Sequence, residues 1–232
     1  MDSSLGAIAL GFVFGLQHAT DADHVVAVAS IVSRTGRFAS GALVGAFWGL
    51  GHTVTIAAAG MAIVLFNVTV TPRAGLSMEL AVAFMLMALG VARIVTLVRD
   101  RDERPGQEAY GHGHDASGFW LVLRTLGPAQ AARSTLTGLV HGLAGSAAVA
   151  LLVLSTVRSP YAAVVYLLVF GLGTIAGMTA ITALLSVPFT ARLPILFRIR
   201  RALALGTGLL SLGFGLYLAV HIGFVDGLLL GR

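Results

Sequence analysis

The stretch that decides the fold lies at residues 4–33 and reads SLGAIALGFVFGLQHATDADHVVAVASIVS, a long apolar run with the polar cluster HATDADH at residues 18–24 near its centre. A helix that crosses a bilayer needs about 20 predominantly apolar residues. One aspartate near the centre of such a helix costs about 2.5–3.5 kcal/mol. Two would oppose insertion unless they are paired, hydrated or bound to a cation. The stretch therefore predicts a membrane span, either as a polar-centred helix or as a helix broken at the cluster.

The remainder of the chain is also too apolar for a soluble protein. Its 232 residues are 57% hydrophobic and 11% charged, with a mean hydropathy of +0.91, whereas soluble domains are about 45–50% apolar and about 25% charged. This composition excludes a globular cytosolic enzyme. Further apolar runs lie at about residues 38–66, 77–98, 135–157, 160–188 and 202–222. We therefore expect an all-α integral membrane protein with six transmembrane helices.

Arginine predicts how these spans are oriented. All fifteen cationic residues are arginine, and eleven of them fall in alternate connections that would face the same side, against three on the other side. Cytoplasmic connections are enriched in basic residues. We expect a multi-pass protein of the plasma membrane with both termini outside and residues 99–134 in the cytoplasm. The excess of arginine over acidic residues is thus a signal of membrane topology. Lipid is the expected partner, and nucleic acid is not.

Similar segments recur at an offset of 122–123 residues. The matched pairs are Gly15–His18 with Gly138–His141, Gly49–Gly51 with Gly171–Gly173, and Ala88–Gly90 with Ser211–Gly213. Because each half would hold three spans, the second copy would enter the membrane from the opposite side. The expected organisation is a three-helix repeat at 1–98, a cytoplasmic loop with an interfacial segment at 99–134, and an inverted three-helix repeat at 135–232. Inverted repeats are typical of transporters with a site near the bilayer midplane; a duplication unrelated to transport is the alternative.

The polar cluster offers metal ligands. On a regular helix His18, Asp21 and His24 share one face, whereas Asp23 joins them only if the helix is distorted. His52 in the second run is a further intramembrane candidate. The chain has no cysteine, and imidazole with carboxylate but no thiolate suits Ni²⁺, Co²⁺, Zn²⁺ or Cu²⁺. The alternative is a buried network of His–Asp pairs without a metal.

Three histidines are weaker candidates. His141 is the repeat partner of His18, and a packing role is an equal alternative for it. His112 and His114 lie in the hydrophilic segment 99–118, where short His-rich tracts can bind metal. A solvated glycine-rich linker is the alternative there.

Two motifs resemble a known family. The sequence HATDADH at 18–24 looks like the HX4DH signature of the nickel/cobalt transporter (NiCoT) family, and Leu50-Gly51-His52-Thr53 is similar to that family's second motif on the next helix. The resemblance implies that a set of five residues selects and translocates the metal, namely His18, Asp21, Asp23, His24 and His52. The later family motifs contain acids, which the corresponding stretches HGLAGSAAV and GLGTIAGMTAITAL lack. There the chain is more similar to the short six-helix relatives associated with urease maturation.

These observations predict a secondary permease in which Ni²⁺ and/or Co²⁺ is the transported ion and no catalytic cofactor is used. No Walker A pattern occurs in the sequence, so ATP-driven transport by this chain alone is not expected. We expect no enzymatic activity. Two alternatives are an intramembrane metalloenzyme and an accessory membrane protein that passes nickel to a cytoplasmic metallochaperone for urease or hydrogenase. The sequence predicts neither the direction of transport nor the oligomeric state.

Overall fold

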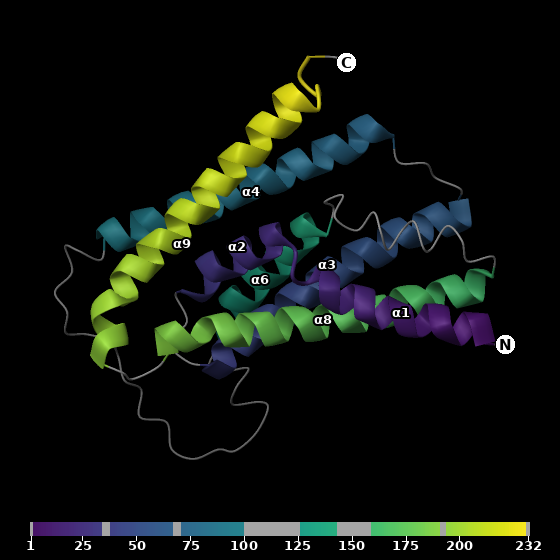
Figure 1. Cartoon of the computed structure of the whole chain (residues 1–232), viewed down its shortest axis with the longest axis horizontal. Coiled ribbons are helices and arrows are strands. Elements are labelled where there is room, and N and C mark those ends of the chain that lie inside the picture. The colour runs from purple at the N-terminus through teal and green to yellow at the C-terminus, as the bar shows by residue number, and fades with distance from the viewer. Residues whose placement is uncertain are drawn as a thin grey trace.

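The computed structural model describes residues 2–33, 38–66, 71–99, 126–142, 159–190 and 194–230. Within these ranges the chain is helical (Figure 1). The elements in chain order are α1 (Asp2–His18), α2 (Ala22–Val32), α3 (Phe38–Phe66), α4 (Pro72–Arg99), α6 (Pro128–His141), α8 (Pro160–Thr190), α9 (Pro194–Val220) and the π-helical turn η2 (His221–Val225). The described part thus holds seven α-helices, whereas the sequence predicted six, because the first apolar run forms two.

Four helices are long and apolar enough to cross a bilayer, at Phe38–Phe66, Pro72–Arg99, Tyr161–Phe189 and Ile199–Val225. They correspond to four of the six expected spans. Large apolar side chains such as Leu172 and Leu184 lie exposed on their outer faces. Lipid tails solvate such faces, whereas water would not. The protein is therefore an all-α, multi-pass membrane protein.

The first apolar run is broken at the polar cluster. α1 ends at His18 and α2 begins at Ala22, with Asp21 in an extended conformation between them (φ −57°, ψ 145°). The Thr20 and Asp21 N–H groups donate to the Gln17 and His18 carbonyls at 2.8 and 3.1 Å, and the Thr20 hydroxyl also donates to Gln17 O. These local bonds satisfy part of the backbone that the break exposes. Of the two forms that the sequence allowed, the broken helix is the one observed.

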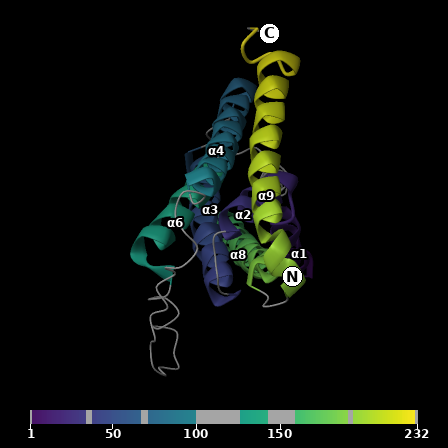
Figure 2. The same ribbon diagram turned by 90° about the vertical axis from the view of Figure 1, so that its left-hand side faces the viewer.

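The helices pack in pairs around α2. α1 lies along α8, α6 along α3, α3 along α8, and α4 along α9 (Figures 1 and 2). α2 is short and central, and contacts α4, α8 and α9. Its far end is held by the buried Arg93, whose Nη2 donates to the Ser33 carbonyl at 3.0 Å. A cation at a helix C-terminus is electrostatically favourable. The polar cluster at the start of α2 is thereby fixed in the interior.

α6 runs across the expected boundary at residues 134 and 135, because it begins at Pro128 and ends at His141. Proline at the first position suits a helix start. The part of the expected interfacial segment from Pro128 onward therefore belongs to the same helix as His141.

Glycines allow two of these helix pairs to cross at backbone contact. A Cβ on Gly138 of α6 would overlap the Trp48 carbonyl of α3, and one on Gly51 would overlap the Thr135 carbonyl of α6. The α1–α8 crossing is built in the same way: a Cβ on Gly15 would overlap the Phe170 carbonyl, and one on Gly173 the Phe12 carbonyl. Each pair needs a residue without a side chain at its closest point.

We expect Gly138→Val to destabilise the protein, because the α3 backbone leaves no room for the added atoms. Overpacking costs about 1–3 kcal/mol, and for a chain of this size each kcal/mol lowers Tm by about 2–4 °C. Gly213→Val in α9 is the matched control, since nothing lies within 4 Å of a Cβ there. Thermal unfolding in detergent measures both variants. Equal Tm values for Gly138→Val and the wild type would contradict the close crossing.

Candidate metal centre

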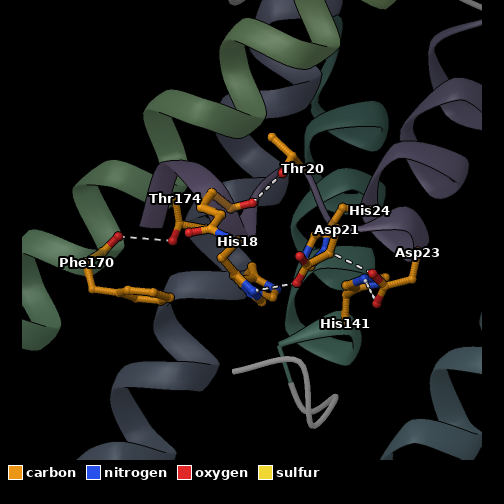
Figure 3. Close-up of polar contacts among 10 residues, drawn as sticks. His18, Thr20, Asp21, Asp23, His24, His141, Phe170 and Thr174 are labelled. Atoms are coloured by element: carbon orange, nitrogen blue, oxygen red, sulfur yellow. Dashed lines mark hydrogen bonds and ion pairs between the residues drawn. The ribbon is translucent and has the colours of Figure 1, made fainter. Parts of the chain in front are cut away.

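Four imidazoles and one carboxylate converge from four helices at the break between α1 and α2. Figure 3 shows four of these residues, namely His18, Asp23, His24 and His141. His18 is the last residue of α1, His24 lies in the first turn of α2, His52 lies in the middle of α3, and His141 is the last residue of α6. All four imidazoles are buried, and none is more than 6% exposed. Asp23 precedes His24 on α2. The cluster thus combines residues that are more than 100 positions apart in the chain.

The ligand atoms form two overlapping groups. His18, His24 and His52 make up one group, and Asp23, His24 and His141 the other; within each group the candidate atoms lie within 4.8 Å of one another. The Nε2 atoms of His18 and His52 are 2.7 Å apart. The ring centroids of His24 and His141 are separated by 4.3 Å. Because His24 belongs to both groups, the two form one continuous cluster.

The two aspartates hold different places in this cluster. Asp23 lies between two imidazoles, with Oδ1 3.2 Å from His24 Nδ1 and Oδ2 3.0 Å from His141 Nε2. Asp21 is 37% exposed, and its Oδ2 lies 2.9 Å from His18 Nδ1. That contact turns the opposite nitrogen of His18 toward His52. A carboxylate on the outer nitrogen of a ligating histidine orients the ring and raises its basicity, so Asp21 supports the cluster from outside while Asp23 belongs to it.

Several buried nitrogens in the cluster make no hydrogen bond. They are Nδ1 and Nε2 of His24, Nδ1 of His52, and Nδ1 and Nε2 of His141. The contacts of Asp23 with His24 and His141, at 3.2 and 3.0 Å, are therefore close contacts without hydrogen-bond geometry. A buried polar atom left without a partner costs about 1–3 kcal/mol. A divalent cation among these nitrogens and the Asp23 carboxylate would supply the missing interactions, and the donor set of nitrogen and oxygen fits Ni²⁺, Co²⁺, Zn²⁺ or Cu²⁺.

Aromatic side chains enclose the cluster. The ring centroid of Trp48, a fully buried residue of α3, lies 5.5 Å from that of His24 and 5.4 Å from that of His141. Phe170 of α8 packs 5.6 Å from His18. This apolar wall lowers the local dielectric and strengthens any interaction between a cation and Asp23. The sequence analysis did not single out either residue, although both sit at equivalent positions, 122 residues apart, in the two matching segments.

Most of the ligands expected from the sequence lie together in the cluster. His18, Asp23, His24 and His52 meet in the cluster, Asp21 adjoins it through His18, and the weaker candidate His141 is part of it. A regular helix over residues 18–24 would have placed Asp23 away from the face of His18; in the structure Asp23 joins the cluster through His24 and His141. His112 and His114 lie outside the described residues.

The chain is similar over nearly its whole length to a urease accessory protein. It is 35% identical over 230 residues to the urease accessory protein UreH of Bacillus sp. (strain TB-90), and the alignment covers 97% of this chain and 95% of that protein. The chain belongs to the UreH family of urease accessory proteins. This confirms the resemblance to urease-associated relatives that the motifs indicated. No family model matches the chain, and no solved structure is significantly similar to it.

We expect His141→Ala to weaken Co²⁺ binding at least tenfold, equivalent to about 1.4 kcal/mol, because it removes one donor of the second group. The control is His221→Ala: His221 lies outside the cluster, 3.1 Å from Asp226 on the exposed η2 turn. Absorption of protein-bound Co²⁺ in detergent reports affinity and coordination together. Wild-type affinity in His141→Ala would exclude this residue as a ligand.

Asp21 and Asp23 form a second matched pair of substitutions. Asp23→Asn removes a charged donor, so we expect the coordinated Co²⁺ spectrum to change and the affinity to fall sharply. Asp21→Asn keeps every donor of the cluster, and loss of an outer carboxylate costs about 10–100-fold in affinity. We therefore expect weaker binding with an unchanged spectrum. A changed spectrum in Asp21→Asn would show instead that Asp21 coordinates the ion.

Proposed function

We propose that this UreH-family chain is a secondary permease for a divalent transition metal, Ni²⁺ and/or Co²⁺, and that the cluster of His18, Asp23, His24, His52 and His141 is its transport site. The observation that carries the proposal is the convergence of buried imidazole nitrogens without hydrogen-bond partners on a carboxylate, at a break in a membrane helix. A bound cation would satisfy these nitrogens, which the contacts with Asp23 leave without hydrogen bonds. The cation is the cargo of the site and not a catalytic cofactor.

The ends of the helices favour a cation at this point. α1 and α6 both end at residues of the cluster, His18 and His141. The C-terminus of a helix carries a partial negative charge, so two such ends add to the charge of Asp23. Transporters commonly place cation sites at the ends of broken helices near the membrane midplane. The break at residues 19–21 matches that arrangement.

The helix contacts support an inverted repeat. The α1–α8 and α3–α6 crossings use glycines at matching positions: Gly15 corresponds to Gly138, and Gly51 to Gly173. His18 and His141 end the corresponding helices. We propose two three-helix repeats at 1–98 and 135–232, joined by a cytoplasmic segment at 99–134, with both termini outside the plasma membrane as the arginine bias predicts. Rocking of one repeat against the other would expose the site to each side in turn.

The overlapping groups suggest how the ion moves through the site. Each His must offer a neutral nitrogen, so binding exchanges water for imidazole and releases protons from any protonated ligand. His24 is common to both groups. An ion can therefore pass from His18 and His52 to Asp23 and His141 without releasing all of its ligands, which would keep the barrier between the two positions low.

The family membership favours nickel as the physiological cargo. The relative is a urease accessory protein, and we propose that nickel carried by this chain reaches a cytoplasmic metallochaperone of a nickel enzyme. A second function is compatible with the same membership. The chain could hold nickel at the membrane for such a partner without moving it across.

The test is Ni²⁺ flux in proteoliposomes, with Asp23→Asn and His24→Ala compared with His221→Ala. We expect both cluster variants to lose at least about 90% of the flux, because each loses a donor, while His221→Ala keeps it. Expression and Tm are measured alongside, so that misfolding is separated from loss of transport.

Two results would redirect the proposal. Ni²⁺ binding by the wild type with no flux in either direction would favour the accessory role over the permease. Undiminished flux in both cluster variants would exclude the cluster as the transport site.

A further inference from the structure

A cavity of about 580 Å³ lies between α2, α4 and α6, where α2 and α4 end and α6 begins. Its polar lining residues are Ser30 of α2, Thr96 of α4, and Gln130, Arg133, Ser134 and Thr137 of α6. Apolar side chains, among them Ile31, Leu89, Val95 and Leu136, form the larger part of the lining. In the proposed topology these helix ends face the cytoplasm.

The polar lining continues to the metal cluster. On α6, residues 130, 134, 137 and 141 recur at spacings of four and three, so they share one face of the helix. The first three line the cavity, and the fourth is His141 of the cluster, about 6 Å beyond Thr137 along the helix axis. On α2, Val26 and Ala27 lie between Asp23 and Ser30 and are buried in an apolar core cluster. The polar row on α6 therefore leads from the cavity to His141.

The hydroxyl groups on this face are arranged as acceptors. Ser134 Oγ donates to the Gln130 carbonyl at 2.9 Å, and Thr137 Oγ1 donates to the Arg133 carbonyl at 2.9 Å. Each hydroxyl uses its proton within its own helix and keeps its oxygen lone pairs for other partners. Water molecules bound to a cation present only protons outward. Such a lining therefore suits a hydrated cation.

The matching face of α1 differs. The positions equivalent to Ser134 and Thr137 are Gly11 and Phe14. Phe14 packs against a core cluster that contains Phe170, and Gly11 faces the Tyr166 ring. The α1 face is therefore apolar and packed, and no comparable polar route follows it among the described residues.

We propose that this cavity is the vestibule through which a hydrated divalent cation enters and leaves the metal cluster. The inference rests on the proposed metal site. It adds that, in this conformation, the site is open toward the end of the molecule where the cavity lies. Among the described residues, Arg133 is the one charged residue that lines the cavity, and it is exposed. Its positive charge disfavours accumulation of cations, so the cavity is not a second binding site.

The natural absence of cysteine allows a direct test. Thr137→Cys and Gln130→Cys place single thiols deep in the vestibule and nearer its mouth. Leu172→Cys, on the outer face of α8, 60% exposed and away from the cavity, is the control. N-ethylmaleimide reacts with hydrated thiols, so we expect it to label both vestibule positions at least about tenfold faster than Leu172→Cys in detergent-purified protein. Equal labelling rates at all three positions would contradict a hydrated vestibule.

The labelled proteins then test passage of the ion. The reagent is neutral and is attached after folding, so it narrows the route without changing the ligands or the fold. We expect the association and dissociation rates of Co²⁺, followed by stopped-flow absorbance, to fall together by about tenfold, with Kd within about twofold of the value for maleimide-treated wild type. Unchanged rates after complete labelling at both positions would overturn the proposal.

These readouts separate the vestibule from the permease. If labelling with N-ethylmaleimide slows Co²⁺ binding but the wild type carries no Ni²⁺ flux, the permease proposal is wrong and the vestibule proposal stands. If Ni²⁺ flux is present but the maleimide label changes neither the association nor the dissociation rate of Co²⁺, the vestibule proposal is wrong and the permease proposal stands. If the wild type binds no Co²⁺, the metal site fails and the vestibule with it.

Discussion

The burial of Asp23 among imidazoles is the constraint on which the rest of this structure depends. A carboxylate inside an apolar helix costs several kcal/mol unless opposite charge or a cation meets it. His24 and His141 come within 3.2 Å of its oxygens. Asp23 and His24 lie side by side in α2, and the break after α1 sets their position relative to His18. The break, the central position of α2 and the inward ends of α1 and α6 all follow from this requirement.

Backbone contact between helices makes the cluster compact. Imidazoles from α3 and α6 can meet over the start of α2 only if those two helices lie unusually close, and Gly51 and Gly138 stand at their crossing. Gly51 directly precedes His52, and Gly138 lies three residues before His141. The residues that set the helix separation thus adjoin the residues that supply the ligands. A side chain at either glycine would widen the crossing and move a histidine out of the cluster together with it.

The sequence was sufficient for some of these features and not for others. Hydropathy is a property of composition, so the all-helical membrane fold followed from it, and the cost of buried charge pointed to HATDADH. The division of the first span could not be decided, because the cluster is compatible with a distorted and with a broken helix. The distinction between Asp21 and Asp23 depends on the extended backbone at Asp21, which no spacing rule encodes. His141 was only a weaker candidate because its partners are more than a hundred residues away, and the repeat offset was the one signal that related it to His18.

The chain combines a nearly symmetric frame with a one-sided set of ligands. Gly15 and Gly138 make equivalent crossings, and His18 and His141 end equivalent helices, but the position that corresponds to His52 is Thr174. Thr174 is fully buried, and its hydroxyl donates to the Phe170 carbonyl at 3.0 Å. Its hydrogen bond is therefore made within its own helix. In the proposed permease, equivalent crossings would let the two halves exchange positions at little energetic cost, which alternating access requires. A second full set of ligands would compete for the ion. With Thr in place of His in one half, the proposed mechanism has one cluster that would hold the ion, and the proposed vestibule would lead to that cluster from one side.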